Sequence, residues 1–215
     1  MSWSLNEIEA EVKKAVRGAG LAWGLAEEGA NAARWLAARA IDPLPALIDV
    51  LDRHAGGNRI STAITLTDDG RWTAPAPLCP ITFGATLCDH ARLIIARGTT
   101  AGPVARPLLV IPFVARAALL LGRNVSLTID GDALLLSARG ERLTGSWPVD
   151  RPDVTAFRCL ATDDAATQMP RMIAPDIAIA PEQWARLQAY AGRTYVPANE
   201  RSRREGAGAG SIDND

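Results

Sequence analysis

The sequence contains very little lysine and histidine. Lys13 and Lys14 are the only lysines among 215 residues, and His54 and His90 are the only histidines. A nucleotide-binding P-loop needs a lysine against the phosphates, and a pyridoxal-phosphate enzyme needs one for its Schiff base. Both lysines fall side by side on a predicted surface helix, which excludes these two classes. Two histidines cannot form a three-histidine zinc site within one chain. We therefore expect no cofactor and no metal.

Cysteine is also scarce. Cys79, Cys88 and Cys159 are an odd number and lack the spacing of paired motifs. Disulfide frameworks belong to oxidising compartments, whereas thiols stay free in reducing ones. The N-terminal stretch MSWSLNEIEAEVKK is acidic and amphipathic, unlike a secretory signal. The sequence therefore predicts a cytoplasmic protein.

Long apolar runs and an excess of one charge are missing as well. No apolar run reaches the roughly 18 residues that a membrane-spanning helix requires. The net charge is −1, which gives no electrostatic reason to expect a nucleic acid or an acidic membrane as partner. Hydrophobic residues make up 48% of the chain, enough for a sizeable core. We expect one globular unit without nucleic acid or membrane as partner.

The N-terminal part predicts packed helices. Ser4 and Glu7 have the spacing of a capping box, in which a serine and an acid satisfy free donors at a helix start. Apolar residues then recur at helical spacing, which predicts an amphipathic helix at residues 5–17. A second, alanine-rich helix is expected at 25–40 and a third at 44–52. The first two helices predict an antiparallel hairpin.

The central part changes to the two-residue period of β-strands. Turn residues such as Asp130-Gly131 separate short apolar runs, which is typical of an antiparallel meander. The Pro-rich stretch 73–84 predicts an irregular connection. The expected strands are 60–66, 71–73, 107–111, 125–129, 134–137, 142–147 and 154–160, with an extended segment at 175–180.

Further helices are expected between and after these strands. A second capping-box pattern, Thr86 to Asp89, predicts a helix to about residue 96. Pro112 and Pro181 fit the first turn of two more helices. Because helices and strands do not alternate regularly, the predicted fold class is α+β: an N-terminal helical hairpin packed against a mainly antiparallel sheet with additional helices. Within the single unit 1–215 we distinguish a helical part (1–58), a mixed part (59–196) and an Arg/Gly-rich C-terminal segment (197–215).

The C-terminal segment contains the candidate anion site. Clustered guanidinium groups match carboxylates and phosphates, and glycine backbone N–H groups can approach a ligand closely. The same composition is also typical of a polar, flexible terminus, and both interpretations stay open. The candidate ligand-binding residues are Arg201, Ser202, Arg203, Arg204, Gly206, Gly208 and Gly210.

Two carboxylates are candidates for acid–base catalysis. Glu27 follows Trp23-Gly24, and a carboxylate beside an aromatic ring can have a raised pKa. Asp89 lies in the cluster Cys88-Asp89-His90. On a helix these neighbours point about 100° apart and cannot act together, whereas on a strand Cys88 and His90 would share a face. Ordinary helix-terminal acids, a buried thiol and a surface histidine are the competing interpretation.

The stretches SLNEIE, WGLAEE and AARWLAAR, together with YVPANERSR, GAGAG and DND near the end, resemble a family of uncharacterised bacterial proteins, a domain of unknown function. The resemblance extends over nearly the full length. It implies a bacterial protein whose C-terminal segment is a family feature, and it implies no particular activity.

Two functions remain open from the sequence. The favoured hypothesis is a protein that binds a small anionic metabolite, a carboxylate or phosphate, with or without a reaction. In the alternative, a non-catalytic accessory subunit docks a protein partner or a second protomer through the C-terminal segment. Substrate, reaction and oligomeric state do not follow from the sequence.

Overall fold

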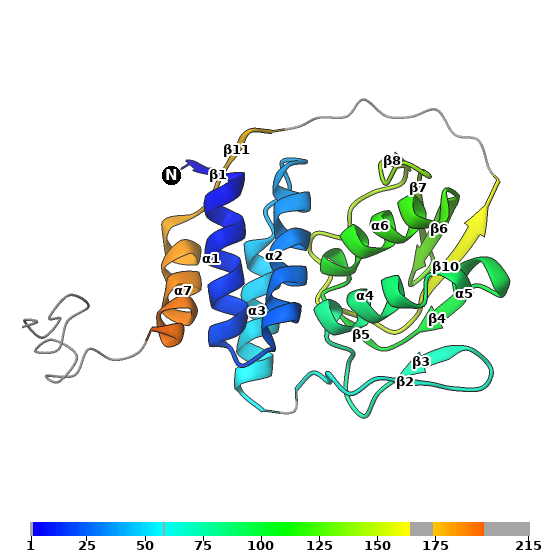
Figure 1. Ribbon diagram of the computed structural model, residues 1–215, viewed down its shortest axis with the longest axis horizontal. Coiled ribbons are helices and arrows are strands. Elements are labelled where there is room, and N and C mark those ends of the chain that lie inside the picture. The colour runs from blue at the N-terminus through cyan, green and yellow to red at the C-terminus, as the bar shows by residue number, and fades with distance from the viewer. Residues whose placement is uncertain (1, 58, 164–173, 196–215) are drawn as a thin grey trace, which may run out of the picture.

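Helices from both ends of the chain form one half of the molecule. The structure, a computed structural model, describes residues 2–57, 59–163 and 174–195. Helices α1, α2 and α3 lie beside α7, which comes from the other end of the described chain (Figure 1). Their bounds are Leu5–Gly18 for α1, Trp23–Ala37 for α2, Leu44–Ala55 for α3 and Pro181–Ala191 for α7. Although the sequence places α7 in the mixed part, it packs on α1 and α3.

Helix α1 begins at the predicted capping box. Ser4 Oγ accepts a hydrogen bond from the backbone N–H of Glu7 (3.3 Å), and the Glu7 carboxylate accepts one from the backbone N–H of Ser4 (2.9 Å). These bonds satisfy donors that the start of a helix leaves unpaired. The helix buries Ile8, Val12 and Val16 on one face and packs against α2 and α7. The predicted N-terminal helix is confirmed.

A two-stranded ribbon joins the two ends of the described chain. Strand β1 (Ser2–Ser4) pairs antiparallel with β11 (Asp176–Ala178). Beside it, the ring of Trp3 stacks on the ring of Trp184 from α7, with 3.8 Å between centroids and 14° between planes. The ribbon and the stacked rings hold the start of α7 next to the start of α1.

The second half contains a sheet whose described strands run in the order β2-β3-β4-β10-β6-β7-β8. Neighbouring strands are antiparallel except for β3 and β4, which are parallel. A separate ribbon pairs β5 with β9. The strand bounds are Thr65–Leu66 (β2), Arg71–Thr73 (β3), Thr99–Ala101 (β4), Val104–Ala105 (β5), Asn124–Ile129 (β6), Asp132–Leu136 (β7), Arg142–Thr144 (β8), Asp153–Val154 (β9) and Phe157–Thr162 (β10).

The predicted meander is present as β6, β7 and β8. Asp130 and Gly131 connect β6 to β7 with φ angles of 46° and 95°. Positive φ at both central residues gives a turn whose twist matches that of the flanking strands. Val125, Leu127 and Ile129 of β6 are buried and alternate with half-buried polar residues. One face of this part of the sheet therefore forms the core.

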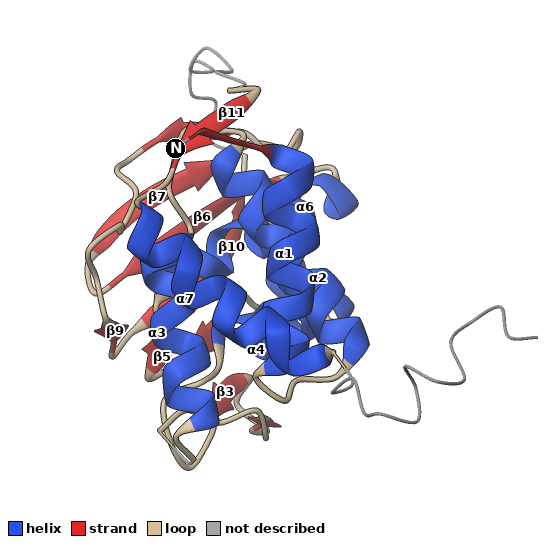
Figure 2. Cartoon of the chain, turned by 90° about the vertical axis from the view of Figure 1, so that its left-hand side faces the viewer, coloured by secondary structure: helices blue, strands red, loops and turns tan. Residues whose placement is uncertain are grey.

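Helices cover that buried face. Helix α6 contacts β6 and β7, and α5 contacts β10. Figure 2 shows the helices in front of the strands. The bounds are Pro80–Asp89 for α4, Arg92–Ala96 for α5 and Ile111–Leu121 for α6. The fold is α+β, as predicted from the sequence. Across the described parts of the chain, no helix has the length and apolar character needed to span a membrane.

The predicted strand at 107–111 is wrong. Residues Pro107–Val110 form a short 3₁₀ helix, η1, which leads directly into α6. A short, fully apolar run fits a buried strand or a buried helix equally well by periodicity. Here all four residues are buried, and the chain continues from them into α6 without an intervening loop.

The predicted helix at 86–96 is wrong in its bounds. Helix α4 already begins at Pro80, after an extended Cys79, so the predicted irregular connection at 73–84 ends too late. Thr86 is in the interior of α4, where its hydroxyl donates to the carbonyl of Thr82 (2.8 Å). A hydroxyl bonded to a carbonyl four residues back does not cap a helix start. Helix α4 ends at Asp89, and α5 is a separate short helix.

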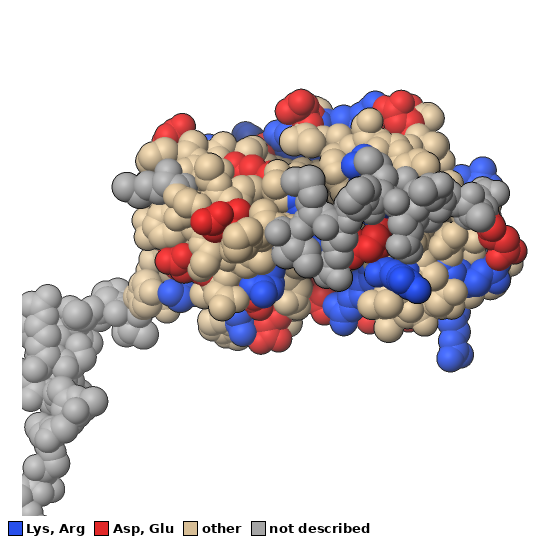
Figure 3. All heavy atoms as spheres, turned by 90° about the horizontal axis from the view of Figure 1, so that it is seen from above, with Lys and Arg blue, Asp and Glu red and all other residues tan. Residues whose placement is uncertain are grey.

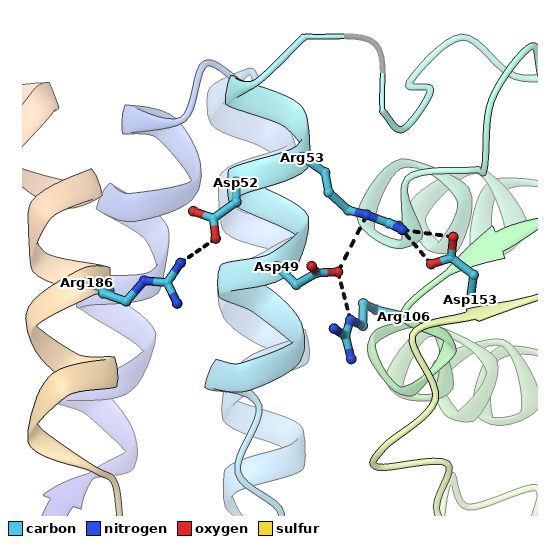
Figure 4. A network of polar contacts seen from close by, with 6 residues as sticks. All are labelled: Asp49, Asp52, Arg53, Arg106, Asp153 and Arg186. Atoms are coloured by element: carbon cyan, nitrogen blue, oxygen red, sulfur yellow. Dashed lines mark hydrogen bonds and ion pairs between the residues drawn. The ribbon is translucent and has the colours of Figure 1, made fainter.

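Helix α3 joins the two halves through charged side chains on its two sides (Figure 4). Toward the sheet half, Arg53 donates from Nη1 and Nη2 to the two oxygens of Asp153 in β9, both at 2.8 Å. Asp49 accepts from Nε of Arg106, just before η1, at 2.8 Å. On the other side, Asp52 pairs with Arg186 of α7. Burial raises the pKa of Asp153, while Arg53 lowers it.

Replacement of Gly84 by alanine tests the packing of α4 on α6. A Cβ atom at Gly84 would lie 2.2 Å from Cδ2 of Phe113, far inside contact distance. We expect Gly84→Ala to lower the free energy of unfolding by about 1–3 kcal/mol, because the ring or the helix must shift. Denaturant unfolding followed by circular dichroism measures this change.

Gly24→Ala is the matched control, since a Cβ atom at Gly24 of α2 has no neighbour within 4 Å. Alanine is the better helix former, so stability should rise by about 0.5–1 kcal/mol. Equal effects of the two substitutions would contradict the close contact between Gly84 and Phe113.

Substitution of Arg53 tests the junction between the two halves. The Arg53 and Asp153 side chains are 21% and 33% exposed, whereas Arg186 and Asp52 are 59% and 42% exposed. Arg53→Met keeps the aliphatic stem but leaves a partly buried carboxylate unpaired. We expect a loss of about 1–2 kcal/mol of unfolding free energy near neutral pH.

The more exposed pair supplies the control for this substitution. Arg186→Met should cost less than about 1 kcal/mol, because water solvates the remaining charge. Without Arg53, the folded-state pKa of Asp153 rises further above its unfolded value, so folding favours the protonated carboxyl. The loss in Arg53→Met should therefore shrink as the pH falls through that pKa. A loss that stays constant down to about pH 3 would contradict this explanation.

Candidate functional site

An open cavity of about 700 Å³ lies between α2, α6 and the turn that connects β7 to β8. Cavities of roughly 300–1,000 Å³ are typical of small-molecule sites. The described residues that line it come from three separated parts of the sequence, residues 28–39, 112–119 and 139–141, and from Leu5. Only the packing of the helical half against the sheet half brings them together.

The α2 wall is one face of the helix and its C-terminal extension. Glu28, Ala32, Trp35 and Arg39 line the cavity at intervals of four, three and four residues. This spacing places side chains on one side of a helix, so a charged residue stands at each end with apolar ones between. Over these 11 residues a helix rises about 16 Å, which separates the two charged ends.

The α6 wall combines apolar side chains with one charge. Ala115, Leu119 and Phe113 line the cavity beside Arg116. Nη1 of Arg116 donates to both carboxylate oxygens of Glu28 across the cavity, at 3.0 and 2.7 Å. This contact joins α2 to α6 at one end of the cavity.

The turn from Ser137 to Glu141 forms the third side. The buried Ser137 hydroxyl accepts from the backbone N–H groups of Arg139 (3.2 Å) and Glu141 (3.1 Å). Gly140 has φ +74°, and a Cβ atom there would lie 3.0 Å from the carbonyl oxygen of Ala115. A side chain at this position would push the turn away from α6. The turn is therefore fixed against α6 and places its charged residues at the cavity.

Arg39 is the least exposed charged group of the cavity. Its guanidinium carbon lies 3.5 Å from the ring centroid of Trp35, and Nη2 donates to Glu141 at 2.8 Å. Nη1 donates to the carbonyl of Trp35 at 2.9 Å, and the side chain is 13% exposed. Trp147 meets the Trp35 ring edge to face, with centroids 5.8 Å apart. These contacts hold Arg39 in one orientation.

The remaining two arginines differ in their partners. Arg34 donates from Nη1 to Asn6 at 2.7 Å, and its Nε lies 3.4 Å from Glu9. The exposed side chain of Arg139 forms no hydrogen bond or ion pair with any residue that the structure describes. Arg34, Arg39 and Arg116 thus each have an acidic partner, and Arg139 leaves one positive charge uncompensated within the described chain.

The two predicted catalytic carboxylates do not line this cavity. Glu27 is 57% exposed and accepts a hydrogen bond from Lys13 at 2.7 Å. Its neighbour Glu28, considered with it in the sequence, is the one that faces the cavity. Asp89 is exposed at the last residue of α4.

The cluster Cys88-Asp89-His90 does not form a catalytic arrangement. Burial raises the pKa of Cys88 to about 12, and its thiol donates to the carbonyl of Phe113 at 3.2 Å. His90 Nδ1 lies 3.0 Å from the carbonyl of Thr86, and its ring meets Trp72 edge to face. Among the described residues, no three His, Cys, Asp or Glu side chains come close enough together to hold a metal ion.

The predicted anion site at the C-terminus lies outside the described residues. This applies to Arg201, Ser202, Arg203, Arg204, Gly206, Gly208 and Gly210. Their role, and the docking of a protein partner through them, remain predictions. No sequence pattern predicted a role for Arg39, Arg116, Arg139 or Glu141. Arg116 has one local signal, because it is the only charged residue within the apolar helix Ile111–Leu121.

One family model, described as protein of unknown function (DUF3726), matches residues 3–75. The match includes SLNEIE, WGLAEE and AARWLAAR, so over this part the chain is similar to an uncharacterised family, as predicted. The matched residues contain α1, α2 and α3, and hence the α2 wall of the cavity, whereas α6 and the turn at Arg139 lie outside them. No curated protein and no solved structure matches the chain.

Thiol labelling tests the assignment of Cys88 as a structural residue. Because Cys79 and Cys159 are buried and the pKa of Cys88 is raised, the folded protein should react with Ellman's reagent at about pH 8 much more slowly than the denatured protein. Ala189→Cys, at an exposed position of α7, is the positive control and should react at once. Rapid labelling of Cys88 in the folded protein would contradict the assignment.

Proposed function

We propose that this protein binds a small anionic molecule, a carboxylate or a phosphate, in the cavity between α2 and α6. The observation that carries the proposal is Arg139, whose guanidinium borders the cavity without a partner in the described chain. A guanidinium presents five N–H donors in a planar fork that matches an oxyanion. Arg139 is therefore the group that would bind an anion first.

Arg116 of α6 presents a second guanidinium to the cavity. Its bonds to Glu28 come from Nη1, and no residue that the structure describes bonds its Nε or Nη2. Glu28 meanwhile fixes the position of the guanidinium. A preorganised donor loses little conformational entropy on binding, which favours affinity.

Binding must depend on these local groups and not on the charge of the whole protein. The net charge is −1, and acidic and basic side chains are interspersed on the face shown in Figure 3. Such a surface does not attract anions over a long range. The two cavity acids, Glu28 and Glu141, each hold an arginine. We therefore propose binding and assign no reaction.

The proposed location is the cytoplasm of a bacterium. Three free thiols are in keeping with a reducing compartment, and the bacterial origin rests on the sequence resemblance alone. The proposed anion would then be a cytoplasmic metabolite.

Substitution of Arg139 tests the proposed function. Isothermal titration calorimetry with acetate, inorganic phosphate and larger organic acids identifies an anion that binds the full chain. We expect Arg139→Ala to weaken that binding about tenfold, since one charge-assisted contact is lost. The melting temperature without ligand should stay unchanged, because the Arg139 side chain bonds no described residue.

Arg92→Ala is the matched control, because Arg92 is exposed on α5 and does not line the cavity. Equal affinity of the Arg139 and Arg92 variants would overturn the proposed site. Deletion of residues 199–215 separates it from the C-terminal prediction. Binding that survives Arg139→Ala but disappears with this deletion would assign the anion to the C-terminal segment.

A further inference from the structure

We propose that the ligand of the α2–α6 cavity is an aliphatic monocarboxylate, an inference that rests on the proposed function. Its carboxylate would pair with Arg139, and its hydrocarbon chain would lie between the helices. Three properties of the cavity lead to this class of ligand: the number of uncompensated charges, the small apolar side chains of its interior, and the state of its aromatic rings.

The charge balance favours one negative charge on the ligand. Arg39 and Arg116 already hold the carboxylates of Glu141 and Glu28 at this cavity. A second negative charge on the ligand would approach these two acids and be repelled by them. Arg139 supplies a single uncompensated positive charge within the described chain. A monocarboxylate balances it, whereas a phosphate dianion exceeds it.

The apolar lining of the cavity favours a ligand with an aliphatic hydrocarbon chain. The apolar lining includes Ala32 of α2, Ala38 just after α2 and Ala115 of α6. Leu119 of α6 also lines the cavity and is 58% exposed. Methyl side chains leave open the space that larger side chains would fill. Removal of hydrocarbon from water is the main source of affinity that such a surface can supply.

The aromatic residues of the lining do not favour a planar ring or a nucleobase. The guanidinium of Arg39 already covers the Trp35 ring at 3.5 Å, and Trp147 meets the same ring edge to face. Phe113 packs against Gly84 of α4 and is only 3% exposed. Base recognition relies on an open aromatic face for stacking. A flexible chain needs none.

The chain-length dependence of binding tests this inference. Titration calorimetry on the full chain would use butanoate, hexanoate, octanoate and decanoate. We expect affinity to rise about fourfold per methylene group while the added group is buried, and then to level off. Octyl phosphate and octanol should both bind more weakly than octanoate, since the former carries excess charge and the latter none.

A cavity-filling variant tests whether the hydrocarbon chain of the ligand lies between the helices. In Ala32→Leu the affinity should stop rising at a shorter acid than in the wild type, because the added side chain occupies part of the cavity. Butanoate should still bind. Ala189→Leu, at an exposed position of α7, is the matched control and should leave the plateau unchanged. Ala38→Leu, at a half-buried position of the same wall, replaces Ala32→Leu if that variant fails to fold.

The outcomes separate this inference from the proposed function. If acetate, butanoate and every longer acid bind with the same affinity, the aliphatic ligand is overturned and the anion site is kept. Tighter binding of octyl phosphate, or equal binding of octanol, would likewise overturn the monocarboxylate. An absence of binding by all anions would overturn both proposals.

Discussion

The contact of α3 with the sheet half is the constraint on which the rest of the structure depends. Arg53 binds Asp153 of the sheet half through two parallel hydrogen bonds, and Asp52 on the other side pairs with Arg186 of α7. Partly buried, two-pronged arginine–carboxylate contacts restrict both distance and angle. The helices built from the chain ends are thereby fixed relative to the sheet. The shape of any cavity between the two halves depends on how they are positioned relative to each other.

The α2–α6 cavity is one such cavity. Its walls come from the two halves, and the contact between Glu28 and Arg116 crosses from one to the other. Alanines of both helices line this space, and their small side chains leave it open. The turn pressed against α6 through Gly140 adds Arg139 to this space. A cavity with an apolar interior, paired arginines and one arginine that no described residue pairs follows from the packing of the fold.

The charges of the cavity also explain why burial is tolerated there. An arginine that is largely shielded from water is costly unless acceptors surround it. Arg39 has the carbonyl of Trp35 and the carboxylate of Glu141, with the aromatic ring beneath its plane. Its position is thus stabilised without a ligand. Arg139 reaches solvent and needs no such partner. Arg39 therefore has a structural role, whereas the guanidinium of Arg139 is exposed to solvent.

The sequence by itself determined the elements whose signals are local. The capping box at Ser4 specifies the start of α1, and Asp130-Gly131 specifies a turn of the meander, because both depend on neighbouring residues. The apolar run at 107–111 fitted both a buried strand and a buried helix, so only its packing in the folded chain decided for a helix. The site was decided by tertiary structure alone. Arg139 and Arg39 are 100 positions apart, and no local pattern records that packing brings them to one cavity.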